Sequence, residues 1–126
     1  MLSAGTSTCT DAVQLALPAA LGGKGGATNP EQLFAAGYAA CFENAVIHVT
    51  RGKADKVKDD DIVVVAEVGM SPNGQGGFAL SVALDVAITG LDQTTAEAIA
   101  AAAHEVCPYS NAVKGNIDVA ITVTTK

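Results

Sequence analysis

Two cysteines are the residues of this chain best suited to carry out chemistry. Cys41 and Cys107 lie 66 positions apart, each in an apolar, alanine-rich segment of helical pattern. A thiol is useful in redox chemistry when a nearby charge stabilises its thiolate and when a second thiol can capture the oxidised sulfur. We therefore interpret Cys41 and Cys107 as a buried redox pair.

The composition limits what else the chain could do. It has 126 residues, of which 49% are hydrophobic and only 4% aromatic, and its formal charge is −6. A chain of this length buries roughly two thirds of its unfolded surface as one domain and needs no disulfides for stability. The negative charge argues against nucleic acid or an anionic membrane surface as a partner. We predict one domain over residues 1–126 with a core of small side chains.

The sequence also indicates a compartment. No segment approaches the roughly 18 uninterrupted apolar residues of a membrane span, and the N-terminus lacks the basic region of a secretory signal. Three cysteines without the spacing of a disulfide scaffold are typical of thiols in a reducing environment. We expect a cytoplasmic protein.

The hydrophobic pattern predicts the elements that must position the cysteines. Alternating or β-branched runs indicate strands, and apolar residues at three-to-four spacing indicate helices. Glycine-rich residues 22–26 form a flexible loop, because the lysine motif of a phosphate-binding loop does not follow them. The predicted strands are 11–17, 62–69, 78–88 and 117–124, a hairpin covers 71–77, and the helices are 30–50 and 93–106. This order predicts an α+β fold in which a sheet covers one side of a helical layer.

The first helix has a clear start. Thr28 or Asn29 can cap it, Pro30 suits the first helical position, and Glu31 complements the helix dipole in the first turn. We expect one face of this helix to be formed by Leu33, Phe34, Gly37, Tyr38, Cys41, Ala45 and His48.

Two long motifs carry a resemblance to a known family. Residues 28–42, TNPEQLFAAGYAACF, and residues 106–119, VCPYSNAVKGNIDV, closely resemble the signature motifs of the organic hydroperoxide resistance proteins, the Ohr branch of the OsmC superfamily. The resemblance covers about residues 11–126, including the order of the elements.

The resemblance implies a fold, an activity and a site. It implies an OsmC-like, intertwined homodimer with two central helices packed against an antiparallel sheet and with active sites at the subunit interface. Organic hydroperoxides would be reduced to alcohols, with Cys41 as the peroxidatic cysteine, Cys107 as the resolving cysteine and Glu31 as the catalytic glutamate. A dihydrolipoyl-bearing protein or a small dithiol would restore the thiols, and no cofactor or metal would be needed.

The position of Glu31 has a consequence for assembly. Ten residues separate Glu31 from Cys41, which is about 15 Å along a straight helix. Glu31 therefore cannot reach its own Cys41 unless the helix is broken, and the simplest shared site takes Glu31 from the partner subunit across a two-fold axis. We expect a monomer to be inactive.

One departure from the family puts the activity in doubt. The resemblance implies an N-terminal arginine that holds the peroxidatic thiolate, at a position near Ser3, where this chain has none; its only arginine is Arg51. A buried thiol without a cation has a raised pKa and reacts slowly. Three explanations stay open: a natural start upstream with a shortened first strand here, substitution by Arg51 or a lysine, or loss of activity.

Other interpretations weigh less. Cys9 lies outside both motifs and is expected to be exposed and incidental. His48 and His104 could join the two cysteines in a zinc site, but their spacings are weak and a closed metal site would block thiol chemistry. The alternative function is a non-catalytic dimer that binds hydrophobic small molecules in the same interface pocket.

Overall fold

The computed structural model describes residues 15–17 and 19–126. The chain divides into two compact units, Met1–Leu33 and Phe34–Lys126. Each unit is described by itself. The prediction of a single domain over the whole chain stays a prediction.

The smaller unit contains the start of the first long helix. Leu15 forms a parallel bridge with Thr28, and the short 3-10 helix η1 (Ala19–Leu21) precedes the glycine loop. Of the predicted strand 11–17, residues 11–14 lie outside the described part of the chain. The capping prediction is confirmed at Asn29: its side chain accepts a hydrogen bond from the Gln32 backbone at 2.8 Å, and the Gln32 side chain accepts one from the Asn29 backbone at 3.1 Å. This reciprocal cap begins helix α1 (Pro30–Thr50).

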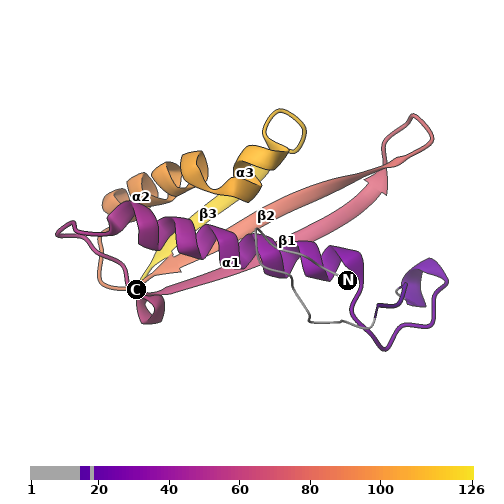
Figure 1. Ribbon diagram of the computed structural model, residues 1–126, viewed down its shortest axis with the longest axis horizontal. Helices are drawn as coiled ribbons and strands as arrows, with labels where there is room; N and C mark the ends of the chain where they lie inside the picture. Colours follow the sequence, from indigo (N-terminus) through magenta and orange to yellow (C-terminus); the bar gives the residue numbers. More distant parts are fainter. Residues whose placement is uncertain (1–14, 18) are drawn as a thin grey trace, which may run out of the picture. The chain divides into compact units, whose positions relative to one another are not determined.

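The larger unit is built on a three-stranded sheet in the order β1-β2-β3 (Figure 1). Strands β1 (Ile62–Pro72) and β2 (Phe78–Ile88) are antiparallel over their whole length. The Asn73 side chain stabilises the predicted hairpin between them by accepting hydrogen bonds from the Gln75 and Gly77 backbone. Before β1, the predicted charged segment ends in a second 3-10 helix, η2 (Asp59–Asp61).

The third strand refines the predicted antiparallel sheet. Strand β3 (Val119–Thr125) pairs parallel to β2, with Val82 opposite Val119. Its connection to β2 runs through helices α2 (Gln93–Val106) and α3 (Pro108–Val113), and such a helical crossover returns the chain in the original direction. The sequence predicted α2 within its observed bounds but did not predict α3.

The ends of α2 explain this difference. Asp92 caps its start, with its carboxylate accepting hydrogen bonds from the backbone N–H of Thr95 at 3.0 Å and from its hydroxyl at 2.6 Å. At the other end Cys107 is extended, with φ −62° and ψ 124°, as expected of a residue before proline. Pro108 then occupies the first position of α3, where its missing N–H costs nothing.

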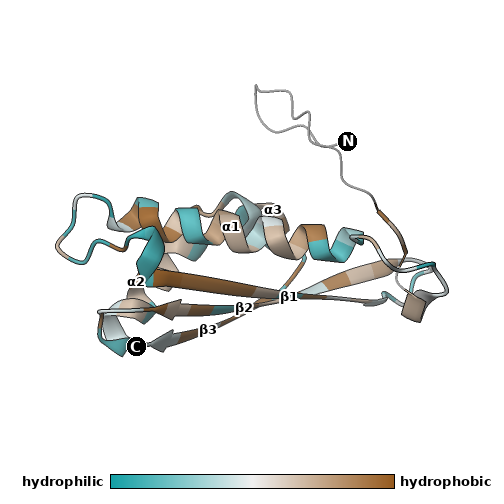
Figure 2. Cartoon of the chain, turned by 90° about the horizontal axis from the view of Figure 1, so that it is seen from below, coloured by the Kyte–Doolittle hydropathy of each residue, from teal (hydrophilic) through white to brown (hydrophobic). Residues whose placement is uncertain are grey.

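The core of the larger unit lies between the helices and one face of the sheet. Figure 2 shows α1 and α3 along one side of the strands. The fully buried side chains come from all three layers, among them Phe42 of α1, Leu84 of β2 and Ala103 of α2. One predicted position is wrong: His48 is exposed, and the buried stripe of α1 passes through Phe42, Ala45 and Val46. A period of 3.6 residues turns His48 away from this stripe.

Within residues 15–17 and 19–126, no helix combines the length and the apolar character that crossing a bilayer requires.

Candidate active site

The two predicted redox cysteines lie next to each other in the larger unit. The sulfur atoms of Cys41 and Cys107 are 3.4 Å apart, and Cys107 donates its thiol hydrogen toward Cys41. Cys107 has no exposed surface, whereas Cys41 is half-buried. Because a disulfide bond is about 2.05 Å long, a small local movement would join these sulfur atoms.

The backbone between α2 and α3 fixes the position of Cys107. The Cys107 N–H donates to the Ala103 carbonyl at 2.8 Å and so completes α2. Asn111 holds the other side of this turn: its N–H donates to the Cys107 carbonyl at 3.0 Å, and its side-chain amide donates to the Glu105 carbonyl at 3.0 Å. Cys107 is thereby held where one helix ends and the next begins, facing the third turn of α1.

The surroundings of Cys41 disfavour its thiolate. Burial raises the pKa of the Cys41 thiol, a hydrogen bond from the Tyr109 backbone N–H lowers it in part, and the neighbouring Cys107 raises it again. Among the described residues, no cation contributes to this pKa. The predicted need for a positive charge near Cys41 is therefore a property of the site as described.

Three aromatic rings lie beside the thiols. The ring centroid of Tyr109 is 6.0 Å from that of Phe34 and 5.7 Å from that of Tyr38, and the Phe34 and Tyr38 rings are 6.2 Å apart in an edge-to-face arrangement. Gly37 makes room for this cluster, because a Cβ atom there would lie 2.7 Å from the Tyr109 hydroxyl oxygen. These rings give the entrance to Cys41 an apolar wall.

A chain of hydrogen bonds leads away from the cysteines, and the sequence analysis did not predict it. The Tyr38 hydroxyl and Ser110 Oγ are 2.6 Å apart, and Ser110 Oγ is 2.8 Å from His104 Nδ1. Tyr38 and Ser110 are buried, and His104 is half-buried. The signal available in the sequence was the spacing that places Ser110 three residues after Cys107 and Tyr38 three before Cys41.

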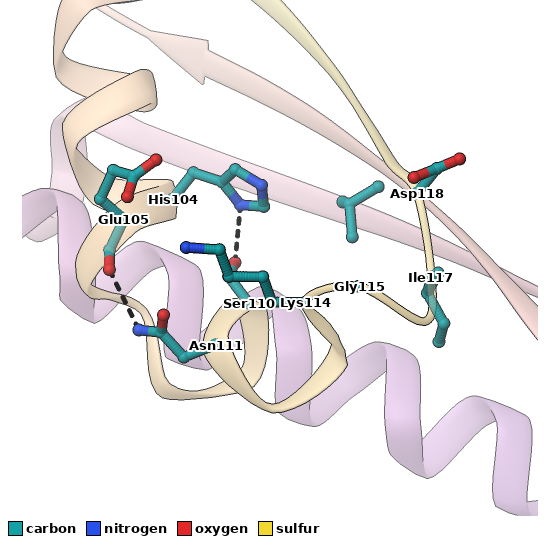
Figure 3. A pocket seen from close by; sticks show the side chains of 9 residues that line it. His104, Glu105, Ser110, Asn111, Lys114, Gly115, Ile117 and Asp118 are labelled. Atoms are coloured by element: carbon teal, nitrogen blue, oxygen red, sulfur yellow. Dashed lines mark hydrogen bonds between the residues drawn. The ribbon is translucent and has the colours of Figure 1, made fainter.

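A polar pocket of about 270 Å³ lies at the far end of this chain (Figure 3). His104 and Glu105 border it from the end of α2, and Lys114 and Asp118 border it from the segment between α3 and β3. Neither cysteine lines this pocket. It reaches the thiols only through the hydrogen-bonded side chains.

The other predicted residues are less closely tied to the cysteines. Glu31 lies half-buried in the first turn of α1, ten residues before Cys41 on one continuous helix, and its catalytic role stays a prediction. Arg51 is exposed just beyond the end of α1. Cys9 and Ser3 lie outside the described residues. In the part of the chain that the structure describes, no three His, Cys, Asp or Glu residues are grouped to hold a metal ion.

The fold and this pair of cysteines define the class of protein. The family model of OsmC-like proteins matches residues 23–122, and the chain belongs to this family. Its similarity lies with one branch: it is 47% identical over 114 residues to an organic hydroperoxide resistance protein of Xanthomonas axonopodis pv. citri, covering 87% of this chain and 77% of that protein. The predicted membership of the organic hydroperoxide resistance branch is thus confirmed.

Solved structures agree. The organic hydroperoxide resistance protein of Legionella pneumophila superposes with a TM-score of 0.83 at 54% identity, covering 89% of this chain and 80% of that one. A Vibrio cholerae protein described as a putative member of the same group, with captopril bound in one of its active sites, gives 0.82 at 56% identity, covering 88% and 75%. The predicted OsmC-like α+β fold is confirmed. These relatives support organic hydroperoxide resistance and do not favour the non-catalytic alternative.

Proposed function

We propose that this chain is a thiol peroxidase that reduces organic hydroperoxides to alcohols through Cys41 and Cys107. The observation that carries the proposal is the 3.4 Å separation of the two sulfur atoms. One thiol is half-buried and can meet a substrate, while the other has no exposed surface. That division suits a first thiol that attacks the peroxide and a second that acts only inside the protein.

The chemistry balances in three steps. The Cys41 thiolate attacks the peroxide oxygen that carries hydrogen, the O–O bond breaks, and the departing alkoxide takes up a proton to become the alcohol. Cys107 then attacks the sulfur of the Cys41 sulfenic acid, so that an S–S bond forms and water leaves. An external dithiol restores both thiols by two exchange reactions and is itself oxidised to a disulfide.

The apolar wall supports bulky organic substrates. The rings of Phe34, Tyr38 and Tyr109 can contact an alkyl or aryl group, whereas hydrogen peroxide offers no apolar surface. Fatty-acid-like and aryl hydroperoxides are therefore the proposed substrate class. The reductant is proposed to be a dihydrolipoyl-bearing protein or a small dithiol, because only a reduced dithiol closes the cycle without a bound cofactor.

The first experiment measures turnover. Reduced protein is mixed with cumene hydroperoxide and dihydrolipoamide, with hydrogen peroxide as the comparison substrate and Cys41→Ser as the matched control. We expect turnover that prefers the organic peroxide and is lost in Cys41→Ser, whereas Cys107→Ser stops after one turnover with a stable sulfenic acid. Turnover equal to that of the Cys41→Ser variant would refute the proposal and would revive the ligand-binding alternative.

Glu31 is proposed to act across a homodimer. The ten residues between Glu31 and Cys41 on continuous α1 span about 15 Å, so we assign the glutamate of each site to the opposite subunit. Mixing two inactive variants, Glu31→Gln and Cys41→Ser, then rebuilds one complete site in each mixed dimer.

The recovery can be stated in advance. Half of the dimers in an equal mixture are mixed and half of their sites are complete, so about one quarter of wild-type activity returns. A glutamate that acts within its own subunit gives no recovery. Each variant dimer alone is the control.

A further inference from the structure

The hydrogen-bonded side chains of Tyr38, Ser110 and His104 connect the buried thiol pair to the polar pocket, and the steps proposed above do not use them. They come from three different helices: Tyr38 from α1, His104 from α2 and Ser110 from α3. The two links are short, at 2.6 Å and 2.8 Å. Each link is within the range of a good hydrogen bond to a hydroxyl or imidazole group.

The need for such a connection follows from the burial of Cys107. Its exposed fraction is 0%, and those of Tyr38 and Ser110 are 0% and 3%. Cys107 must lose its proton to become the thiolate that attacks Cys41, yet bulk water does not touch it. Groups of the protein must therefore accept that proton.

Tyr38 is placed to begin the transfer. Burial raises the pKa of its phenol, the hydrogen bond with Ser110 lowers it, and the charges of Cys107 and then Cys41 raise it further. The thiols therefore lie within electrostatic reach of the Tyr38 oxygen. A phenol with a raised pKa stays protonated at neutral pH, so it can accept a proton at its oxygen only by passing its own hydrogen onward.

The rest of the chain has the required polarity. When His104 Nδ1 is unprotonated, Ser110 donates to it and Tyr38 donates to Ser110, so all hydrogen bonds point from the thiols toward the pocket. The pocket of about 270 Å³ has room for several water molecules, to which His104 can pass the proton. The arrangement thus leads from a dry thiol to a polar cavity (Figure 3).

We propose that Tyr38, Ser110 and His104 form a proton relay that removes the Cys107 proton as the disulfide closes. The Cys107 proton passes to Tyr38, the Tyr38 proton to Ser110 and the Ser110 proton to His104 Nδ1. The Cys107 thiolate attacks the Cys41 sulfur, the S–O bond of the sulfenic acid breaks with its electron pair, and the hydroxide takes up a proton from water at the half-exposed Cys41. His104 releases its proton into the pocket, and the net products are the disulfide and one water molecule.

His104 makes the relay sensitive to pH. Histidine is the side chain that ordinarily titrates near neutral pH, and an imidazolium cannot accept the transferred proton. The charged groups that face it are Glu105 from its own helix, Lys114 and Asp118 around the pocket, and Glu97 in a hollow between α2 and β3. We expect disulfide closure to slow as the pH falls through the range in which histidine becomes charged.

The test separates closure from the first oxidation. Reduced protein is mixed with one equivalent of cumene hydroperoxide, quenched with acid, and analysed by intact mass for thiol, sulfenic acid and disulfide. In Ser110→Ala and Tyr38→Phe, we expect closure to slow about 100-fold more than sulfenic acid formation, the size of effect typical of general acid–base groups. Ser110→Thr keeps a hydroxyl and restores closure, and Thr94→Ala, which removes an exposed hydroxyl from α2, leaves both steps unchanged.

Two readouts distinguish a relay from a structural role. Wild-type closure shows a solvent deuterium isotope effect and a loss of rate at low pH, and we expect Ser110→Ala to lose the first and His104→Gln to lose the second. Closure at the wild-type rate in Ser110→Ala and Tyr38→Phe overturns the relay. So does a slower closure that keeps the wild-type isotope effect and pH profile.

The inference rests on the proposed function, and a second oxidant makes the two separable. Diamide adds to the Cys41 thiolate without any peroxide chemistry, and Cys107 then displaces the hydrazine product to form the same disulfide. If wild-type protein fails with cumene hydroperoxide but closes with diamide in a Ser110-dependent way, the peroxidase proposal falls and the relay stands. Diamide closure that is equally fast in Ser110→Ala overturns the relay.

Discussion

The substitution Gly37→Ala tests how closely the aromatic wall is packed against α1. An added Cβ would lie 2.7 Å from the Tyr109 hydroxyl oxygen and 3.2 Å from two of its ring carbons. These distances are too short for the ring to stay where it is. Because the Tyr109 side chain is 38% exposed, it can swing toward solvent and relieve the overlap.

The expected change in stability is a difference between two terms. Alanine is about 1 kcal/mol more favourable than glycine inside a helix. Moving the Tyr109 ring gives up its contacts with Phe34 and Tyr38, each worth about 0.5–1.5 kcal/mol beyond buried area. The net loss in the free energy of unfolding is therefore about 1 kcal/mol, although the site itself is rearranged.

A double-mutant cycle makes this prediction specific. Tyr109→Phe removes the atom that lies 2.7 Å from the added Cβ, so the double variant should be more stable than the sum of the two single changes predicts. Urea denaturation measures the four free energies of unfolding, and cumene hydroperoxide consumption follows the site. Additive effects, or a loss of more than about 3 kcal/mol in Gly37→Ala, would refute the idea that ring displacement relieves the overlap.

Three further predictions follow from single contacts. Ser110→Ala leaves the buried Tyr38 hydroxyl without its partner at 2.6 Å, and urea denaturation should show a loss of about 1–3 kcal/mol that Tyr38→Phe in the same chain largely removes. Because burial raises the pKa of Cys41, its alkylation by iodoacetamide should be slow at pH 7 and accelerate about tenfold per pH unit up to that pKa; a plateau below pH 8, with Cys41→Ser as the blank, would contradict this. Asp92→Ala should lower the melting temperature by removing the cap of α2, and because these hydrogen bonds lower the pKa of Asp92 below 3.8, its contribution is present at neutral pH and lost as the pH falls through that lowered pKa.

Local signals were enough to predict most of the elements. The cap before Pro30, the alternation through Phe78–Ile88 and the alanine-rich run of Gln93–Val106 each specify one backbone conformation within a few residues. The two cysteine motifs likewise identified Cys41 and Cys107 as a pair and indicated the family. These features depend on neighbours in the chain, and a sequence displays such neighbours directly.

Tertiary structure decided what depends on residues far apart. Pro108 marked the end of α2 in the sequence, but only the fold shows that the chain continues as α3 and brings Ser110 against Tyr38 and His104. The parallel pairing of β3 and the exposure of His48 were set in the same way, by how helices pack on the sheet. A side chain's partners across 72 residues are chosen by packing of the whole core, so no local pattern could have indicated them.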